Sequence, residues 1–320
     1  MRNRIPLLAV AVLALTGCRY KPLCYDHNHL VDVRVVYDWK DAPEAELEGM
    51  TVLFYDLSGK ADEPIRYDLP GKEGGVVRLP HGDWQAVSYN YDSESILFRG
   101  LHSIGTVEAY TRSSSVAEGT KLMTRGEMPR ESSSANQPVI LEPEAFWGAA
   151  SEPFQLQIYD PERTIVITPQ PLYRQVYVTI NNVPNLQYTN GLGGALSGLA
   201  PSVFVADGQL ADGCAVEAFS IMVADKTTLT AQFLIFGHCP YSEREVYTHN
   251  LTIYVIMSDG SKWYYTVDVT GQMHDRIKNP DGQPIYIDID GLDVPKPIVN
   301  GSGFHPTVDD WKNEEIEVHM

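Results

Sequence analysis

The sequence predicts an all-β protein with two tandem β-sandwich domains, and three observations carry this prediction. Short runs such as 31–37 and 285–290 alternate apolar and polar residues, which is typical of half-buried strands. Turn residues, mainly Gly, Pro, Asp and Asn, separate these runs at short and fairly regular intervals, as they do in sandwiches. No stretch has the periodicity of a long amphipathic helix. A chain of 320 residues suits two domains of ordinary size.

The first domain is expected to span residues 30–147. Its strands are predicted at 31–37, 50–55, 67–69, 75–79 and 83–90. Residues 112–137 form a Ser-rich stretch without alternation, which indicates an inserted loop. Residues 138–141 are then expected to return as the last strand of this domain, and 142–148 to connect it to the second.

The second domain is expected to span residues 148–293. Its strands are predicted at 154–158, 164–168, 176–180, 218–224, 229–236, 254–257, 262–267 and 285–290. Asp259-Gly260 is the central pair of a predicted two-residue hairpin turn. That turn would place Ile256 opposite Trp263 and Tyr254 opposite Tyr265, as stabilising aromatic pairs.

A tail follows at 294–320, and its last residues alternate again. Ile316, Val318 and Met320 are separated by Glu317 and His319, so the terminus is strand-like. Two interpretations remain open: a final strand of the second domain, which we favour, or an edge that pairs with a strand of another subunit.

Residues 1–17 are typical of a bacterial lipoprotein signal peptide. Arg2 and Arg4 precede an apolar run at 5–15, and Leu15-Thr16-Gly17 leads directly into Cys18. The apolar run is too short to cross about 30 Å of hydrocarbon. Cys18 is therefore predicted to receive acyl chains such as palmitate, with residues 18–29 as the lipidated tether. The alternative is an ordinary secretory signal with a cysteine at this position by chance.

The three remaining cysteines are Cys24, Cys214 and Cys239, an odd number for an exported protein. Because Cys214 and Cys239 lie in the same half of the chain, a disulfide between them is the leading pairing, worth about 3 kcal/mol. Cys24 pairing with one of them is the alternative. The chain has no Cys-x-x-Cys pair, which argues against a structural zinc site.

Two weak metal candidates stand out, and we expect neither to bind an ion. His27 and His29 lie on one side of an extended segment, where a solvated polar entry into the first strand is the simpler interpretation. Asp288, Asp290 and Asp293 offer three carboxylates to Ca²⁺. Their glycine comes too early for an EF-hand loop, and strand alternation already turns Asp288 and Asp290 towards solvent.

Two stretches partly match a known cofactor-binding or catalytic motif, but neither matches fully. We therefore predict a non-enzymatic protein without a cofactor. Residues 191–196 lack the third glycine of a dinucleotide loop, and 194–198 are one residue out of register for a nucleophile elbow. The formal charge of −18 becomes −20 once residues 1–17 are removed, because Arg2 and Arg4 are lost. Such an acidic chain argues against a nucleic-acid partner.

Several stretches of the sequence resemble a Bacteroidales lipoprotein family of unnamed function. They are Cys18, Lys21-Pro-Leu-Cys24-Tyr-Asp-His27, 33–39 with Ala42-Pro43, Gly49-Met50, Phe54-Tyr55, 69–71, 79–82, 90–92 and 309–320. That family is similar to the anchor proteins of the minor and major fimbriae of the same order. The resemblance implies two transthyretin-like sandwiches, lipid retained at Cys18, and an outer-membrane location.

The same resemblance implies a role as base or accessory subunit in fimbria (pilus) assembly or cell adhesion. Shaft subunits of such fimbriae are trimmed after an arginine to open a groove for a neighbour's strand. No arginine here lies in an obviously equivalent loop, and Arg125 in the Ser-rich stretch is only a candidate, which favours an anchor over a shaft subunit. The expected partners are the membrane, through the lipid on Cys18, and fimbrial subunits or other envelope proteins. The periplasmic and cell-surface faces of the outer membrane both remain open.

An alternative function is a surface glycan-binding lipoprotein of a polysaccharide-utilisation system. Eighteen tyrosines and five tryptophans offer rings on which sugars stack. Most of these aromatic residues lie at predicted strand positions, however, where core and cross-strand packing is the ordinary interpretation.

Overall fold

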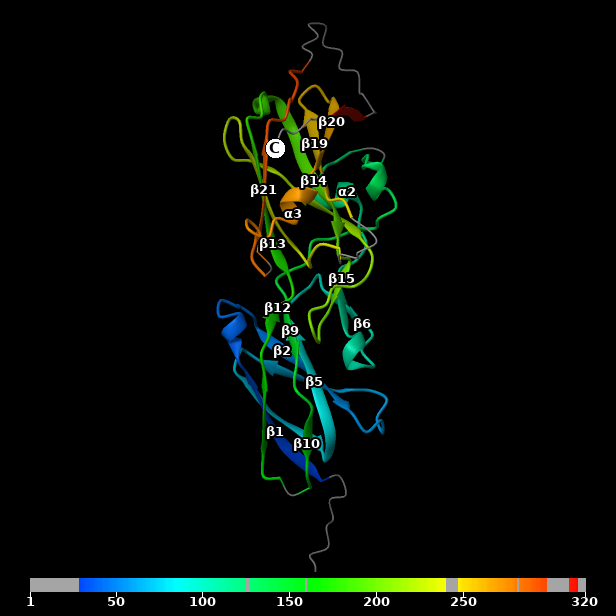
Figure 1. Ribbon diagram of the computed structural model, residues 1–320, viewed down its shortest axis with the longest axis vertical. Helices are drawn as coiled ribbons and strands as arrows, with labels where there is room; N and C mark the ends of the chain where they lie inside the picture. Colours follow the sequence, from blue (N-terminus) through cyan, green and yellow to red (C-terminus); the bar gives the residue numbers. More distant parts are fainter. Residues whose placement is uncertain are drawn as a thin grey trace, which may run out of the picture.

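Two β-sandwiches follow each other along the length of an elongated molecule (Figure 1). The computed structural model describes residues 29–124, 127–158, 160–239, 247–280, 282–297 and 311–315. Strands dominate this part of the chain, and its only α-helices are the short α2 (Val116–Thr120) and α3 (Thr270–Met273). The predicted all-β class is therefore confirmed. None of the helices in the described ranges is long and apolar enough to span a bilayer.

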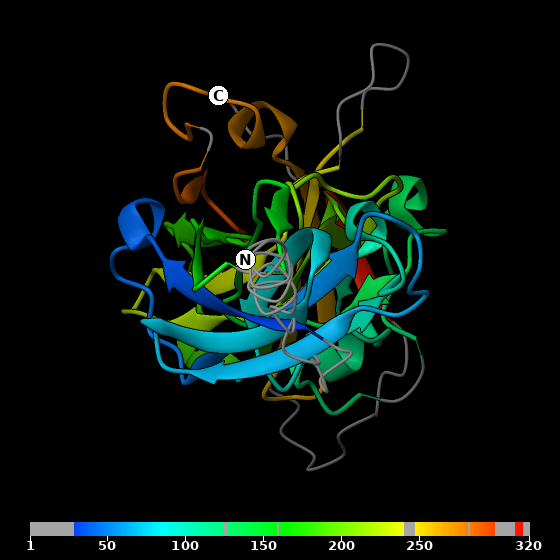
Figure 2. The same ribbon diagram turned by 90° about the horizontal axis from the view of Figure 1, so that it is seen from below.

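The first sandwich packs a three-stranded sheet against a six-stranded one. The small sheet has the order β11 (Arg163–Ile167), β1 (Leu30–Tyr37) and β4 (Gly74–Pro80). The large sheet has the order β12 (Gln170–Pro171), β9 (Trp147–Ala150), β5 (Gly82–Asn90), β2 (Gly49–Asp56) and β3 (Ile65–Pro70), with β10 (Phe154–Leu156) also paired to β5. Figure 2 looks along the long axis, with these blue and cyan strands nearest the viewer. Fully buried side chains such as Val33, Phe54 and Leu79 fill the space between the sheets.

The predicted domain boundary between residues 147 and 148 is wrong, because the first sandwich continues to β12. Strands β9 and β10 pair with β5, and β11 runs parallel to β1, with Val35 opposite Ile165. Local alternation predicts such strands but does not reveal which core they complete. Ile165 and Ile167 belong to the first core, so the chain completes the first sandwich before it enters the second again at β13 (Arg174–Asn181).

A third, small sheet links the two sandwiches. Its strands are β6 (Leu97–Arg99), β7 (Glu108–Tyr110) and β15 (Ser202–Phe204), so it combines chain from both halves of the sequence. We call the cluster beneath it the shared core; its fully or largely buried members are Leu53, Tyr55, Val87, Tyr89, Ile96, Val107, Ala109, Phe146, Leu172, Val203, Val205 and Phe236. Because Phe146 and Phe236 lie in this one cluster, apolar burial joins the two sandwiches.

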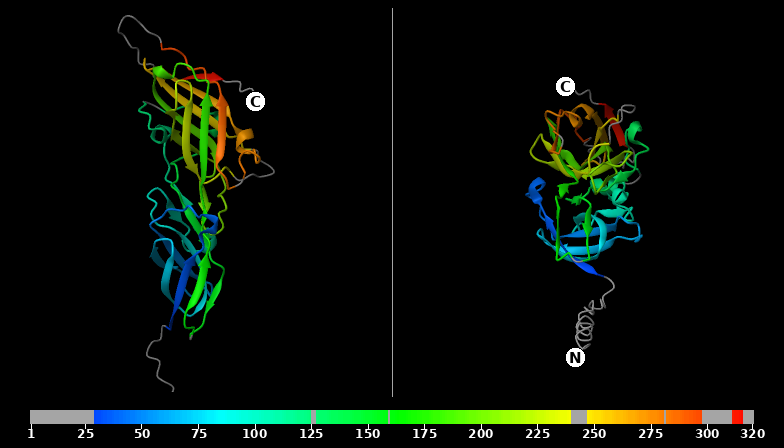
Figure 3. Two further views of the ribbon diagram at one scale, coloured as in Figure 1. Left: turned by 90° about the vertical axis from the view of Figure 1, so that its left-hand side faces the viewer. Right: turned by 60° about the horizontal axis from the view of Figure 1, so that its bottom comes forward.

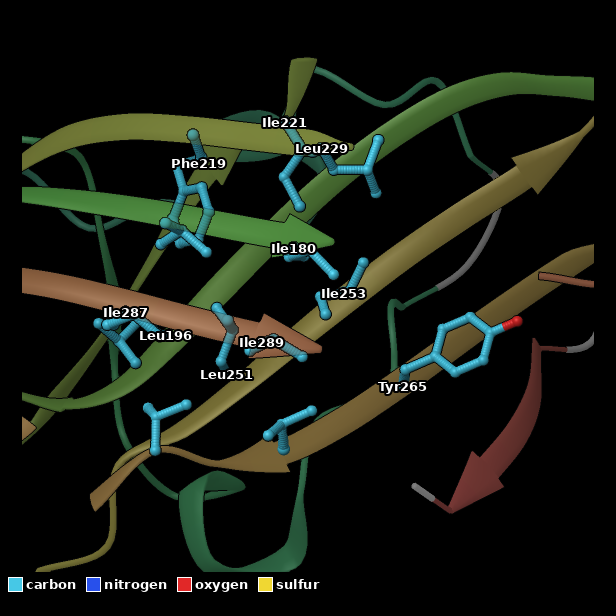
Figure 4. Close-up of a cluster of buried hydrophobic side chains, with 14 of the residues drawn as sticks. Ile180, Leu196, Phe219, Ile221, Leu229, Leu251, Ile253, Tyr265, Ile287 and Ile289 are labelled. Atoms are coloured by element: carbon cyan, nitrogen blue, oxygen red, sulfur yellow. The ribbon is translucent and has the colours of Figure 1, made fainter. Parts of the chain in front are cut away.

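The second sandwich also has two sheets. One has the order β17 (Met222–Val223), β18 (Leu229–Ile235), β13 and β21 (Ile285–Asp290). The other has the order β22 (Trp311–Glu315), β20 (Lys262–Asp268), β19 (Asn250–Met257), β14 (Thr189–Leu199), β16 (Ala215–Ser220) and β8 (Val139–Ile140). Leu196, Ile253 and Ile287 are fully buried between the sheets (Figure 4).

The described parts of the Ser-rich stretch, 112–124 and 127–137, cover the outer face of the second sandwich. Ser115 caps α2 by accepting a hydrogen bond from the Glu118 backbone N–H (3.2 Å). Val116 and Met128 pack with Tyr254 of β19 in one apolar cluster. Strand β8 then pairs parallel to β16. The prediction that 138–141 complete the first domain is therefore wrong, since two apolar residues are too short a pattern to specify a sheet. Arg125 lies outside the described residues.

The hairpin between β19 and β20 differs from the prediction by one residue. Val255 lies opposite Trp263, and Tyr254 opposite Tyr264. The Met257 backbone N–H donates to the Ser261 carbonyl (2.8 Å), which leaves a three-residue loop ending in Gly260 at φ +81°. A three-residue loop with glycine in the left-handed region shifts the pairing relative to a two-residue turn.

The tail contributes β22, which pairs parallel to β20 with Trp311 opposite Lys262. The Trp311 ring packs at 74° to that of Tyr254, with centroids 5.4 Å apart. Residues 311–315 thus form an edge strand of the second sandwich. Ile316, Val318 and Met320 lie outside the described residues, so strand pairing with another subunit stays a prediction.

Phe146 offers a test of the shared core. Its side chain is fully buried, with its ring centroid 5.7 Å from that of Phe98. We expect Phe146→Ala to lower the free energy of unfolding by about 3–5 kcal/mol, because it removes a large apolar side chain and leaves a cavity. Urea unfolding followed by tryptophan fluorescence measures this change. The matched control is Met123→Ala, whose fully exposed side chain should change stability by less than about 0.5 kcal/mol. An unchanged unfolding midpoint for Phe146→Ala would show that the shared core contributes little.

Candidate functional site

The two ends of the molecule are built from different parts of the chain. Strand β1 starts at the end that lies farthest from the second sandwich (Figure 3). Cys18, Cys24 and His27 precede it and lie outside the described residues. Any attachment through the N-terminal segment would therefore act at the free end of the first sandwich.

The metal candidates that lie within the described residues make separate contacts. The His29 ring contacts that of His81, with centroids 6.1 Å apart. Lys278 Nζ lies 2.6 Å from an Asp288 carboxylate oxygen, and Asp290 accepts a hydrogen bond from the Asn182 amide. Asp293 is exposed. In the described ranges, neither His29 nor these aspartates belong to a group of three ligands close enough to share an ion.

Cys214 and Cys239 are joined in a disulfide, with Cα atoms 5.5 Å apart. Cys214 immediately precedes β16 and Cys239 follows β18, so the bond links the two sheets of the second sandwich. The Cys239 backbone N–H also donates to the Gly198 carbonyl (2.8 Å). Cys239 is therefore held through both its side chain and its backbone N–H.

The two glycine-rich stretches that partly match a dinucleotide loop and a nucleophile elbow lie in a β-strand. Residues 191–198 all lie within β14, and a Cβ on Gly193 would stand 2.5 Å from Thr120 Cβ of α2. A Cβ on Gly194 would stand 2.5 Å from the Phe219 ring. These glycines thus permit close packing on both faces of the sheet. Ser197 Oγ accepts a hydrogen bond from the Asn250 backbone N–H (3.0 Å). Ser197 therefore has a structural role in joining β14 to β19.

The connection at 142–144 contains two glutamates, and each is hydrogen-bonded to a different sandwich. Glu142 accepts a hydrogen bond from the Leu234 backbone N–H of β18 (3.0 Å). Glu144 accepts hydrogen bonds from Ser93 Oγ (2.6 Å) and the Glu94 backbone N–H (2.7 Å) in the first sandwich. The connection is therefore anchored at both ends by charge-assisted hydrogen bonds.

Glu217 is a buried carboxylic acid in the same region. It lies in β16, is 1% exposed, and neither carboxyl oxygen has a hydrogen-bond partner. Burial raises the pKa of Glu217 well above its ordinary value, and the nearby Glu142 raises it further. Both effects favour the protonated, neutral form of Glu217.

A cleft of about 540 Å³ lies at the junction of the sandwiches. Its lining includes Asp41 and Gln170 from the first sandwich and Leu210 and His238 from the second. The Arg174 guanidinium at its edge donates to the carbonyl oxygens of Pro280 and Gln283, which fixes one wall.

A family model described as "Domain of unknown function (DUF5119)" matches residues 17–220, more than half of the chain. The chain belongs to this family. The matched region begins just before Cys18 and ends with β16, so it includes the first sandwich, the shared core and part of the second sandwich.

A relative of this DUF5119 member is named "Putative fimbrium anchoring subunit Fim4B" and comes from Bacteroides ovatus. The two sequences are 34% identical over 105 residues, which is 33% of this chain and 31% of the relative. The chain thus spans about a third of the length of the curated relative it matches.

Solved structures share the fold of this DUF5119 member. One is described as "a putative adhesin" from Bacteroides ovatus, with a TM-score of 0.62, 21% identity, and coverage of 88% of this chain and 99% of the other. Another is the fimbrial anchor protein Mfa2 from Porphyromonas gingivalis, with a TM-score of 0.51, 11% identity, and coverage of 82% and 90%. The resemblance to fimbrial anchor proteins expected from the sequence is confirmed.

Sequence reasoning missed two features that the structure brings out. The first is Glu217, which the sequence does signal, as a single charge within the apolar run Ala215-Val-Glu-Ala-Phe219. The second is a group of three histidines, His238, His249 and His274, the only group of three or more potential metal ligands in the described part of the chain. They lie on separate elements and form no local motif, so only the fold brings them together.

Glu217 predicts an unusual dependence of stability on pH. The unfolded carboxyl ionises at about pH 4.3, whereas the pKa of the folded one is raised, so stability is lost as the pH rises from the unfolded pKa towards the folded one. Glu217→Gln removes this proton linkage in a side chain of similar shape. We expect similar stability of variant and wild type near pH 4, and a gain for the variant that grows as the pH rises towards the folded pKa, by at most about 1.4 kcal/mol per pH unit.

Urea unfolding at several pH values measures this difference. The control is Glu152→Gln, which changes an exposed glutamate in the first sandwich. If the Glu217→Gln variant gains nothing over the wild type between pH 4 and 7, Glu217 is ionised or solvated in the folded protein.

Proposed function

We propose that this protein is a lipid-anchored outer-membrane subunit that holds a fimbria, or a similar adhesive structure, on the bacterial cell. The observation that carries the proposal is the 34% identity over 105 residues to a relative named as a fimbrium anchoring subunit. The elongated two-sandwich fold, shared with the fimbrial anchor Mfa2, supports it.

The N-terminal segment orients the protein in this proposal. Cys18 would carry the acyl chains, and two or three such chains make membrane attachment stable. The tether from Cys18 to β1 reaches at most about 40 Å when fully extended, so the first sandwich would stay near the membrane. The second sandwich would project away and meet the fimbrial subunit.

The work proposed here is mechanical, and it needs no catalysis or cofactor. Tension from the polymer would enter the second sandwich and pass to the first through the shared core and the connection at 142–144. The hydrogen bonds of Glu142 to β18 and of Glu144 to residues 93–95 tie that connection to both sandwiches. Such a protein would bind other envelope proteins rather than nucleic acid, in keeping with its formal charge of −18.

The lipid anchor is tested by Cys18→Ala. We expect the variant to lose incorporation of a palmitate analogue and to leave the membrane fraction, because no other acylation site is proposed. Fractionation and metabolic labelling in the native cell measure both effects. The matched control is Cys24→Ala, which should stay labelled and membrane-bound. Persistence of Cys18→Ala in the membrane fraction would show that something other than lipid holds the protein there.

The anchoring role is tested in cells that assemble fimbriae. We expect cross-linked, full-length protein to co-purify with a fimbrial subunit, and cells with Cys18→Ala to shed their fimbriae into the medium. Immunoprecipitation and electron microscopy of cells and medium measure these outcomes. If no fimbrial subunit co-purifies and deletion leaves fimbriae attached, the proposal is wrong. Retention on a polysaccharide affinity gel together with that result would point to glycan binding.

A further inference from the structure

Three histidines meet in the second sandwich. His238 lies after β18 and bridges to Leu199, His249 directly precedes β19, and His274 forms the C-cap of α3. One ring nitrogen from each lies within 4.8 Å of the other two. His249 is fully buried and His274 is exposed, so the group reaches from the interior to solvent.

The hydrogen bonds of two rings set which nitrogen is free. His249 Nδ1 lies 3.2 Å from the Ser197 carbonyl oxygen, and His238 Nδ1 lies 3.2 Å from the Cys239 carbonyl oxygen. A carbonyl oxygen only accepts, so each Nδ1 carries the hydrogen and each Nε2 keeps its lone pair. Metal-binding histidines are oriented in this way, with the second ring nitrogen donating to a carbonyl or carboxylate.

Two of the remaining ring nitrogens lie next to each other. His249 Nε2 and His274 Nε2 are 3.0 Å apart. Two nitrogens at this distance share either a proton or a cation. Zn–N bonds of about 2.0–2.1 Å in a tetrahedron correspond to N···N separations of roughly 3.3 Å. His274 is exposed, so a small rotation of its ring would bring its Nε2 from 3.0 Å to the separation of two ligands on one ion.

The backbone around His249 is shaped to hold its ring. Gly198 has φ +76° next to the irregularity in the pairing of β14 with β16, and a Cβ there would stand 2.6 Å from His249 Nδ1. Thr270 Oγ accepts a hydrogen bond from the His249 backbone N–H (2.8 Å). His238 is held by its neighbour Cys239, through the disulfide and the hydrogen bond to Gly198. The missing side chain and the positive φ of Gly198 thus leave room for the His249 ring.

We propose that His238, His249 and His274 bind one divalent transition-metal ion of the zinc type through their Nε2 atoms, with water at the fourth position. Three neutral imidazoles suit zinc, whereas Ca²⁺ and Mg²⁺ require oxygen ligands. The ion would tie the end of β18 in one sheet to the start of β19 in the other, and both to α3. It would therefore staple the second sandwich beside the junction cleft, which His238 also lines.

The test uses the full mature chain without a polyhistidine tag, stripped of metal by a chelator. Competition between the protein and a chromophoric chelator for Zn²⁺ measures stoichiometry and affinity. We expect one ion per wild-type chain and a rise in Tm on adding Zn²⁺ but not Ca²⁺. His274→Gln, at an exposed position, should fold normally, weaken Zn²⁺ binding by at least about ten-fold and lose the rise in Tm.

Two further variants distinguish a specific three-histidine site from non-specific binding of Zn²⁺ by surface histidines. His102→Gln is the matched control, because His102 is exposed and contacts only Glu63 among the ion pairs of the described residues. It should bind Zn²⁺ as the wild type does, and His238→Gln should behave as His274→Gln. The proposal is overturned if the wild type binds no Zn²⁺ at one ion per chain, or if His274→Gln and His238→Gln bind it as tightly as His102→Gln.

Discussion

The shared core is the constraint on which the rest of this structure depends. The chain leaves the first sandwich after β5, builds β6 and β7, covers the second sandwich with the Ser-rich stretch, and then returns to complete the first sandwich with β9 to β12. Each crossing passes the cluster around Phe146 and Val203. Neither sandwich is therefore made from one continuous piece of chain, and the junction between them is part of the folded interior.

This interleaving explains which features were predictable from the sequence. Strands with strict alternation, such as β1 and β21, were predicted because their pattern reports one buried face. The boundary near 147 was missed because alternation does not say which core a strand completes, and β11 completes that of the first sandwich. The hairpin register was missed because Ser258 joined Asp259 and Gly260 in a longer loop than the dipeptide alone suggests.

The candidate functional residues also fall into those that local sequence predicts and those that only the fold brings together. Cys18 was predicted from a local motif, and the resemblance that predicted a fimbrial anchor rests on short local stretches spread from Cys18 to residues 309–320. The three histidines could not be predicted, because His238 and His274 reach His249 only through the packing of two sheets and a short helix. Glu217 lies between these cases: its place in an apolar run was visible, but the lack of any hydrogen-bond partner was not.

The position of β1 within its sheet has a consequence for a protein held by its N-terminus. Strand β1 lies between β4 and β11 and is paired on both sides, antiparallel to one and parallel to the other. A pull along this strand meets two ladders of hydrogen bonds in shear, so that many bonds resist together. An edge strand pulled from its end would instead unzip one bond at a time. The strand that follows the N-terminal segment is thus harder to peel from the fold than an edge strand would be.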